Sequence, residues 1–425
     1  MQKISIVGFG KIGQAMAAHI LRQGWQVTAI DNNAEQLNFY TTSGFHSVEP
    51  GVEDIIQPAL YAGHLQLSPD YASVSGSAAI ILCIPLLVDE QKQINKTPFL
   101  DCVQQLAPWL QQKVLLMVET SVPVGFCRKD IQPVLTSTGK THGTDYLLAA
   151  SPERIKSGTM LEQLQNIPRA LGGLDAEAGQ AALKVYGHFF RNEQLILLPG
   201  AEAAEFMKLA GMVYRDVNIA LSNQLAMFAQ ATGLDLVDLI PLINADREAA
   251  LLQPGIGVGG HCTPVYPYFM MENFREAGLD FSLAAESRRI NEAMAAFAWS
   301  QLKTHLHKKK VLILGLSFRP QVKEDALSVT YNLQKVLESE NVSAQLHDPY
   351  YSAEEIRGKG FDPCPDIYAT TAEAVILVTM HKMYHEIDWL VMKEKGVRFV
   401  LDGRNQLDRA AIEKAGLQYT GIGKL

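Results

Sequence analysis

Short runs of apolar residues alternate with longer amphipathic segments over the first third of the chain. Five such runs predict strands, at residues 4–7, 26–30, 79–84, 114–119 and 146–150. Mainly apolar runs of this length are typical of strands that are buried on both faces of a parallel sheet. Because helix-like segments separate them, the pattern predicts an α/β fold with a doubly wound parallel sheet.

The periodicity changes in the middle of the chain and then returns. Residues 201–243 have helical spacing with few breakers, and Gly233 followed by Asp235 predicts the end of one long helix and the start of the next. Further strands are expected at 310–314, 342–347, 374–379 and 398–401. The last third therefore predicts a second parallel-sheet domain.

Composition excludes several classes of protein. A chain of 425 residues is too long for one hydrophobic core, and 48% hydrophobic with 19% charged residues is ordinary for a globular protein. The net charge of -8 argues against a nucleic-acid partner. The longest apolar run, residues 78–88, contains a proline and is too short to span a bilayer, so no membrane partner is expected.

Cysteine usage indicates a reducing compartment. The five cysteines are odd in number and none has CxxC spacing, so we expect neither a disulfide framework nor a metal site. No secretory signal is recognised before the first predicted strand, and a cytoplasmic location is expected.

A glycine motif follows the first strand. Gly8, Gly10 and Gly13 form GxGxxG between this strand and a helix-like run, and Asp31 ends the second strand. Gly8 allows a tight turn, Gly10 lets backbone approach a pyrophosphate, and Gly13 lets helix and strand pack closely. Asp31 is placed to accept hydrogen bonds from a ribose, and no Arg or Lys lies between it and Gln36 to hold a 2′-phosphate, so the motif predicts NAD. The alternative is a glycine-rich turn in a plain α/β domain.

Polar or proline-containing turns follow the later strands of this sheet. Since the carboxyl ends of parallel strands face the ligand crevice, Ser121, Pro123 and Glu153 are expected to share the edge that holds the nicotinamide. The residues predicted to bind the cofactor are Gly8, Phe9, Gly10, Lys11, Ile12, Gly13, Asp31, Pro85 and Ser121.

A second glycine-rich stretch surrounds a cysteine. Residues 255–264, here called the thiol loop, read GIGVGGHCTP. Ordering so many glycines costs backbone entropy, which indicates a requirement for tight bending or exposed backbone amides. A lone cysteine is more often a small buried apolar residue, but a thiolate next to such backbone is also suited to attack a carbonyl carbon.

These motifs, in this order, identify a resemblance. The chain resembles the UDP-glucose/GDP-mannose dehydrogenases over nearly its full length, through GFGKIG, ETSVPVG, SPERIKSG, EFMKLAGMVYRDVNIA, PGIGVGGHCTP, ILGLSFRPQVKED and LDGRN. GGHC, SPER and RDVNIA are similar to the branch that acts on UDP-N-acetylhexosamines. The resemblance implies two Rossmann-like domains joined by a long helical segment. The expected boundaries are an NAD-binding domain at 1–198, a central helical domain at 199–305 and a nucleotide-sugar-binding domain at 306–425.

The resemblance also implies a reaction. A 6-hydroxymethyl group becomes a carboxylate through two hydride transfers to NAD, with Cys262 as the nucleophile that forms a thiohemiacetal and then a thioester. Lys208 is expected to stabilise the reacting oxygen, Glu153 to handle water and protons, and Ser121 to take a place that usually holds threonine. His261 either favours the thiolate when protonated, or packs or binds substrate.

The substrate and assembly follow from the same resemblance. The residues expected to bind a UDP-sugar are Glu153, Arg154, Lys208, Arg215, Asn218, Arg247, Gly255, Gly259, His261, Arg319 and Arg404. Arg247 matches an arginine that a neighbouring subunit often supplies, and a homodimer through the helices of residues 201–243 is expected. The family suggests a role in the biosynthesis of surface polysaccharide precursors.

Two positions depart from the family pattern. Met212 stands where an asparagine usually follows the lysine by one helical turn, and Tyr266 stands where an aspartate usually follows the cysteine by four residues. A local alignment slip, use of the Tyr266 hydroxyl with water on an unusual sugar, and altered chemistry are the competing explanations. Two rivals follow: a single-oxidation dehydrogenase of the 3-hydroxyacid or 6-phosphogluconate type, and a sensor or scaffold that binds NAD and a nucleotide sugar without turnover.

Overall fold

The computed structural model describes residues 2–424 and forms two compact units. Unit 1 comprises the chain up to Gly211 together with Tyr268–Leu279, and unit 2 comprises Met212–Pro267 and the chain from Asp280 onward. Two boundaries fall inside α8 (Ala201–Thr232) and α10 (Tyr266–Glu276), and the third follows α10, after Leu279. The expected division into three domains stays a prediction.

Unit 1 is built on an eight-stranded sheet with the order β10-β9-β8-β7-β4-β1-β2-β3. Its strands are β1 (Lys3–Val7), β2 (Gln26–Ile30), β3 (Leu65–Ser68), β4 (Ala79–Leu82), β7 (Val114–Val118), β8 (Tyr146–Ala150), β9 (Arg169–Gly173) and β10 (Leu195–Leu197). A short antiparallel hairpin, β5 (Leu87–Val88) with β6 (Ile94–Asn95), lies outside this sheet.

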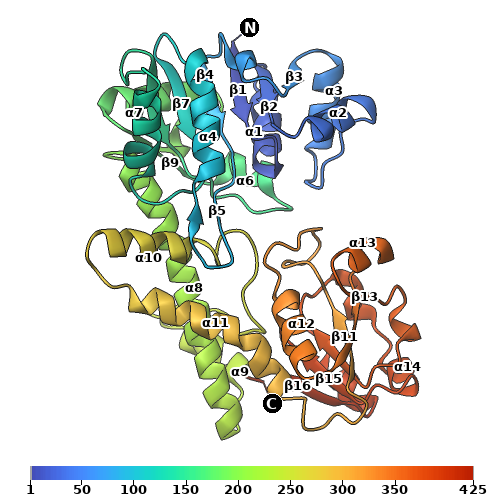
Figure 1. Cartoon of the computed structure of the whole chain (residues 1–425). Coiled ribbons are helices and arrows are strands. Elements are labelled where there is room, and N and C mark those ends of the chain that lie inside the picture. Colours follow the sequence, from blue (N-terminus) through green and yellow to red (C-terminus); the bar gives the residue numbers. More distant parts are fainter. Residues whose placement is uncertain (1, 425) are drawn as a thin grey trace. The chain divides into compact units, whose positions relative to one another are not determined.

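Seven α-helices of the described residues lie wholly in unit 1. They are α1 (Lys11–Arg22), α2 (Ala34–Thr42), α3 (Glu53–Tyr61), α4 (Thr97–Leu106), α5 (Gln132–Ser137), α6 (Met160–Asn166) and α7 (Ala176–Tyr186). Helices α1 and α7 contact the sheet (Figure 1). They share one apolar core with it, to which Ile4, Ile6, Ala17 and Ala182 belong.

Unit 2 contains a six-stranded parallel sheet with the order β13-β12-β11-β14-β15-β16. Its strands are β11 (Lys310–Leu314), β12 (Ser343–His347), β13 (Asp362–Pro363), β14 (Ala374–Leu377), β15 (Phe399–Asp402) and β16 (Gln418–Gly421). Its further helices are α9 (Leu236–Ile243), α11 (Ser282–Ser300), α12 (Val329–Ser339), α13 (Ala353–Gly358), α14 (Trp389–Glu394) and α15 (Arg409–Lys414).

The sequence of strand β11 does not alternate between apolar and polar residues, because both of its faces are buried. Val311 and Ile313 belong to one buried cluster, whereas Leu312 and Leu314 belong to another. Successive side chains of a strand point to opposite faces, so both faces of this sheet are covered. A continuous apolar run is the expected result.

Both sheets confirm the predicted doubly wound fold. In each, the first strand lies between the second and the fourth of its unit, at the point where the strand order reverses and where ligands bind. Apart from one pair, the ladders of the two sheets are parallel: β9 runs antiparallel to β8, which corrects the expectation of a fully parallel first sheet. A single apolar run carries no information on direction, so the sequence could not reveal this reversal.

The predicted helix break in the middle is confirmed. Gly233 has φ +74°, a backbone conformation that residues other than glycine rarely adopt. It follows the last residue of α8, and the Asp235 side chain accepts a hydrogen bond from Asp238 N at the start of α9. Predicted strands 79–84 and 374–379 end earlier, at Leu82 and Leu377, where the chain turns away from the sheet.

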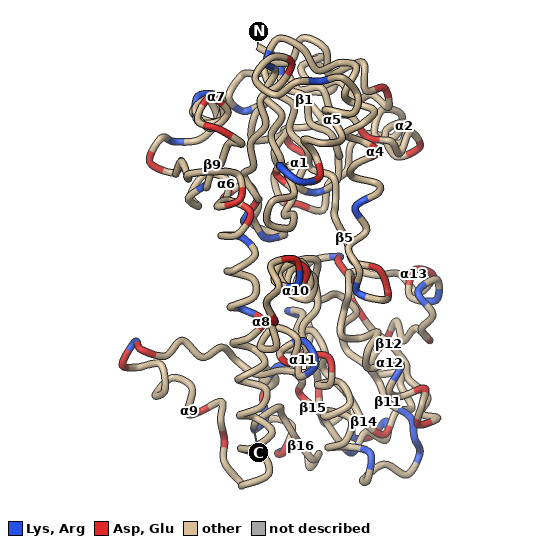
Figure 2. Tube along the Cα trace, turned by 60° about the vertical axis from the view of Figure 1, so that its left-hand side comes forward, with Lys and Arg blue, Asp and Glu red and all other residues tan. Residues whose placement is uncertain are grey.

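Charges of both signs are interspersed along the chain (Figure 2). Within residues 2–424, no helix is long and apolar enough to cross a membrane.

Candidate active site

The glycines of the first loop are required by close backbone packing. Gly8 has φ +94°, and a Cβ there would lie 2.8 Å from the carbonyl of Cys83. A Cβ on Gly13 would lie 2.1 Å from the carbonyl oxygen of Gly8. A Cβ on Gly10 would meet no atom within 4 Å. Gly8 and Gly13 therefore serve the turn and the helix packing, while Gly10 leaves open space beside the backbone.

Helix α1 presents an N-terminus that is suited to an anion. Gly10 caps the helix without a side-chain hydrogen bond, and the first turn, which contains Lys11 and Ile12, has no acidic residue. The partial positive charge and the backbone amides of such a terminus bind phosphates. The open space at Gly10 and this terminus together fit the pyrophosphate of a dinucleotide.

Asp31 lies directly after β2 and faces the same loop. Its Oδ2 accepts from Phe9 N at 2.8 Å and its Oδ1 accepts from Asn33 N at 2.9 Å. The residue is half-buried. A carboxylate held at this position by two amides, and still reached by solvent, fits the hydroxyls of an adenosine ribose.

Replacing Asp31 with alanine is expected to raise the KM for NAD about tenfold to a hundredfold and to leave kcat nearly unchanged. The reason is the loss of a charge-assisted hydrogen bond to ribose, worth about 1.5–3 kcal/mol. Initial rates measured against NAD and NADP test this, and the preference for NAD should shrink. Glu35→Ala, an exposed acid nearby, is the matched control for net charge. Equal effects of both changes would contradict a direct ribose contact.

The loop after β7 carries a buried hydroxyl. Ser121 is 3% exposed, and its Oγ finds no hydrogen-bond partner among the described residues. The neighbouring Thr120 donates to the carbonyl of Ile84, which ties this loop to the loop after β4 that carries the exposed Pro85. A buried hydroxyl without a partner costs free energy unless a ligand or water completes it. Ser121 therefore fits a role in holding the cofactor or the reacting group.

Lys208 and Glu153 form a buried pair in unit 1. Lys208 Nζ donates to the carbonyl oxygen of Glu153 at 2.6 Å and lies 3.7 Å from its carboxylate Oε1. Lys208 is 6% exposed and Glu153 is 8% exposed. The second carboxylate oxygen accepts from Ile155 N at 2.8 Å. The structure thus brings together an ammonium group and a carboxylate that the sequence could only name separately.

A buried triad beneath this pair was not predicted. Glu119 is fully buried after β7 and accepts from Arg169 Nη2 and from the Tyr186 hydroxyl, and its own carbonyl accepts from Glu153 N at 3.0 Å. Burial raises the pKa of Glu119, and Arg169 opposes this shift. The triad holds the Glu153 backbone, so it supports the site without facing it.

The thiol loop in unit 2 is packed too closely for side chains at several positions. A Cβ on Gly260, which has φ +103°, would lie 2.8 Å from the Phe318 ring. A Cβ on Gly259 would lie 2.8 Å from the carbonyl oxygen of Leu327, and one on Gly255 would lie 3.0 Å from Arg404 Nη1. Gly260 N donates to the carbonyl of Ala326 at 2.9 Å. At Gly259 the backbone of Leu327 fills the space that a Cβ would take, at Gly260 the Phe318 ring fills it, and at Gly255 the Arg404 guanidinium and the Gly403 carbonyl fill it.

Cys262 lies half-buried at the end of this loop, just before α10. Its carbonyl accepts from Val265 N at 3.1 Å and from Tyr266 N at 3.0 Å, which closes the turn that starts the helix. A thiol near a helix N-terminus is favoured in its thiolate form. His261 is 54% exposed, with Nε2 3.9 Å from Glu324 Oε1.

The remaining predicted substrate residues fall into two groups. Arg154, Arg215 and Arg247 are exposed, whereas Asn218 and Arg319 are half-buried. Asn218 binds the segment before the thiol loop, since its Oδ1 accepts from Leu252 N at 2.8 Å.

Arg404 faces the thiol loop. It donates from Nε to the carbonyl of Val378 at 2.7 Å and from Nη1 to that of Gly257 at 3.2 Å. Burial lowers the pKa of its guanidinium to about 10, so it stays charged at neutral pH.

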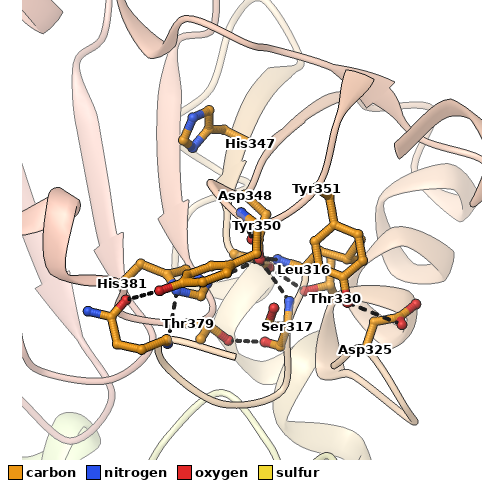
Figure 3. A network of polar contacts seen from close by, with 12 residues as sticks. Leu316, Ser317, Asp325, Thr330, His347, Asp348, Tyr350, Tyr351, Thr379 and His381 are labelled. Atoms are coloured by element: carbon orange, nitrogen blue, oxygen red, sulfur yellow. Dashed lines mark hydrogen bonds and ion pairs between the residues drawn. The ribbon is translucent and has the colours of Figure 1, made fainter. Parts of the chain in front are cut away.

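The second sheet has an acid in the position that corresponds to Asp31, but it is closed to ligands (Figure 3). Asp348 follows β12 and accepts from Leu316 N at 2.7 Å, from Ser317 N at 2.9 Å and from His381 at 3.1 Å. Burial alone would raise the pKa of Asp348, but His381 and the amides hold it below its usual value. At 2% exposure this carboxylate is used internally, so Asp348 is not available to a cofactor ribose.

The fold and these residues define a class. An N-terminal doubly wound domain with a dinucleotide loop and a terminal acid, followed by long helices and a second doubly wound domain, is typical of an NAD-dependent dehydrogenase. The chain belongs to the UDP-glucose/GDP-mannose dehydrogenase family. Models of its NAD binding domain, its central domain and its UDP binding domain match residues 2–190, 202–293 and 312–409.

Relatives of known name cover almost the whole chain. A UDP-N-acetyl-D-mannosamine dehydrogenase of Pyrococcus horikoshii is 28% identical, with 99% of each chain covered. An NDP-N-acetyl-D-galactosaminuronic acid dehydrogenase of Ralstonia solanacearum is 25% identical, with 91% of this chain and 92% of that protein covered.

Solved structures confirm the fold. The structure of the UDP-D-ManNAc dehydrogenase from Pyrococcus horikoshii has a TM-score of 0.86 at 26% identity and 99% coverage of both chains. A UDP-glucose dehydrogenase from Pyrobaculum islandicum has a TM-score of 0.89 at 21% identity, with 100% of this chain and 98% of that chain covered.

Proposed function

We propose that this protein oxidises the C6 alcohol of a UDP-N-acetylhexosamine to the uronic acid, in two hydride transfers to NAD, with Cys262 as the covalent nucleophile. The observation that carries this proposal is the thiol loop, whose glycines are fixed by packing and which ends in a half-buried cysteine at a helix N-terminus. A merely structural cysteine would need none of these features. UDP-hexoses without the N-acetyl group are the second substrate class.

The proposed reaction consists of two oxidations at C6 followed by one hydrolysis. Loss of a proton and a hydride converts the alcohol into an aldehyde, and the Cys262 thiolate adds to the carbonyl carbon to give a thiohemiacetal. Loss of a second hydride gives a thioester, which water cleaves to the carboxylate and the free thiol. NAD, when bound, accepts one hydride in each oxidation.

The residues of unit 1 suit the proton and charge movements. Lys208 carries a positive charge that would stabilise the alkoxide and the tetrahedral oxyanion, and Glu153 lies 3.7 Å from it as an acceptor for a proton from water. Their meeting with Cys262 around one substrate is part of the proposal. Ser121, with its unpartnered hydroxyl, is proposed to bind the same reacting group or the nicotinamide side.

A second candidate is favoured by Met212 and Tyr266. Family members usually place an asparagine and an aspartate there, and loss of an oxyanion donor such as the asparagine costs about a hundredfold or more in rate. Release of the aldehyde after one oxidation, or binding with very slow turnover, follows if nothing replaces the two groups. The preserved Cys262 and Lys208 favour the full reaction.

A panel of UDP-sugars separates these candidates. NADH release and mass detection of the sugar product are measured for UDP-N-acetylmannosamine, UDP-N-acetylgalactosamine, UDP-N-acetylglucosamine and UDP-glucose. The proposal predicts acid formation with at least one N-acetylhexosamine and two NADH per sugar. Aldehyde with one NADH supports the single oxidation, and binding without NADH supports the scaffold.

The proposed assembly is a homodimer through α8 and α9. Four large side chains along α8 are exposed at helical spacing, Tyr214 at 59%, Leu221 at 51%, Leu225 at 37% and Phe228 at 63%. Leu242 of α9 is 73% exposed. An apolar stripe of this kind on a long helix is suited to pair with a second copy. The exposed Arg247, with φ +68°, would then be available to a neighbouring site.

Phe228→Ser is expected to weaken the dimer by about a hundredfold or more in Kd, because both copies are lost and each buried phenylalanine contributes about 1.5–3 kcal/mol. Light scattering over a dilution series measures this. Phe39→Ser, which removes a phenylalanine that is 46% exposed in unit 1, should leave the Kd unchanged. An unmodified protein that is monomeric at micromolar concentration would contradict the proposed interface.

A further inference from the structure

The start of the thiol loop is tied to two helices through buried side-chain amides. Asn223 of α8 is fully buried, and its Oδ1 accepts from Gly255 N at 2.9 Å. Its Nδ2 donates to Asn291 Oδ1 of α11 at 2.9 Å. A single asparagine therefore joins the first residue of the loop to the interior of unit 2.

A buried charge fixes the orientation of these amides. Asn291 Nδ2 donates to Asp216 Oδ1 at 2.9 Å and to the Asp216 carbonyl at 3.0 Å. Since Asp216 only accepts here, the amide nitrogen of Asn291 must face it, and its oxygen must face Asn223. The nitrogen of Asn223 is then directed to Asn291 and its oxygen to Gly255 N. The three hydrogen bonds therefore have one direction: Gly255 N donates to Asn223, Asn223 donates to Asn291, and Asn291 donates to Asp216.

The charge itself is held by an arginine of α11. Arg288 Nη1 donates to Asp216 Oδ1 at 2.7 Å, and both residues are at most 3% exposed. Burial raises the pKa of Asp216, and Arg288 opposes this shift. Arg288 also contacts Glu292 at 3.2 Å. A buried ion pair is a poor source of net stability, and a role in fixing the position of other groups explains its presence better.

The neighbouring loop residues are held with similar firmness. Ile256 N donates to the carbonyl of Gly403 at 2.9 Å, and Arg404 donates to that of Gly257. A Cβ on Gly257 would lie 3.2 Å from the carbonyl oxygen of Asn291, so α11 also sets how closely the loop can approach. The backbone of residues 255–257 is thus fixed from three directions, seven to five residues before Cys262.

We propose that Asn223 is a positioning residue: with Asn291 and Asp216 it fixes the backbone at Gly255 and thereby the place and exposure of the Cys262 thiol. The expected effect on catalysis rests on the proposed function, whereas the expected effect on the position and exposure of the thiol is independent of it. Placement errors of about 1 Å can cost a hundredfold in rate. Loss of the amide should therefore lower kcat more than it raises KM, and should loosen the loop.

Asn223→Ala and Asn291→Ala are the test variants, and Gln230→Ala is the matched control. Gln230 also lies on α8 and donates to a backbone carbonyl, that of Gly421 at 2.9 Å, but it does not contact the loop. The first readout is the rate of alkylation of Cys262 by iodoacetamide, measured by mass spectrometry of its peptide. It needs no substrate and no activity.

The expected result is that both test variants are alkylated at Cys262 about tenfold faster than the unmodified protein, while Gln230→Ala is not. Their kcat with the best UDP-sugar should fall about a hundredfold, with KM changed by less than about threefold. Equal alkylation rates in test and control variants would overturn the inference. If alkylation changes but no sugar is oxidised even by the unmodified protein, the proposed function fails while the positioning role stands.

Hydrogen exchange keeps the inference testable if the variants do not fold. In the unmodified protein the Gly255 amide hydrogen should exchange slowly, because its acceptor is a fully buried side chain. Exchange of this amide as fast as that of exposed loop residues such as Ala250 would overturn the proposal.

Discussion

Replacing Cys262 with alanine is expected to lower the rate of uronic acid formation roughly a thousandfold or more. Without the thiol no carbon–sulfur bond holds the aldehyde for the second oxidation, so NADH should not exceed one per sugar. Product analysis by mass spectrometry together with NADH counting measures both effects.

Cys364→Ala is the control for this experiment. Cys364 is a buried thiol of the second sheet domain, 3% exposed and remote in sequence from the loop. Its loss should change the melting temperature by a few degrees and leave the ratio of NADH to sugar unchanged. Continued acid formation by the Cys262→Ala protein would refute covalent catalysis by this residue.

The combined change Tyr266→Asp and Met212→Asn is expected to raise the rate of thioester hydrolysis about a hundredfold. It restores the two polar side chains that the family usually places near the lysine and the water. In the unmodified protein, which lacks these two side chains, hydrolysis is expected to limit the rate. That protein should therefore release a rapid burst of NADH followed by a slow steady phase. Stopped-flow absorbance should show that the burst disappears in the double variant.

Tyr266→Phe distinguishes the remaining explanations. Tyr266 is only 8% exposed, and its backbone amide closes the turn at Cys262. If its hydroxyl has replaced the aspartate, removal of that hydroxyl should slow hydrolysis further. No change in Tyr266→Phe and no gain in the double variant would contradict the view that these two positions limit the reaction.

Local patterns were sufficient for much of the fold. Strands 26–30, 146–150 and 310–314 were predicted with the observed bounds, because mainly apolar runs and flanking turns define them. The break between α8 and α9 followed from Gly233 and Asp235, whose backbone and capping preferences act within a few residues. Strand direction was not predictable, and the antiparallel pairing of β9 with β8 depends on how distant segments dock.

The site was predictable only where a motif names the residues. Close backbone packing excludes a Cβ at Gly8 and Gly13, as the motif predicted, and the thiol loop is constrained as its glycines indicated. The ribose contact of Asp31 stays a prediction. Asn223, Asn291 and Asp216 were missed. They are ordinary residues on helices, and their function arises from contacts across 68 and 75 residues of sequence. The Glu119–Arg169 pair was missed for the same reason, since its partners are 50 residues apart.

Covalent capture of the sugar on the thiol is the most direct test of the account. The unmodified protein is mixed with NAD and its best UDP-sugar, quenched in acid during the steady phase and digested, and the peptide that contains Cys262 is examined by mass spectrometry. The account predicts a nucleotide-sugar adduct on Cys262, and this adduct should be less abundant in the protein that carries both Tyr266→Asp and Met212→Asn. An unmodified Cys262 peptide during active acid production would contradict it.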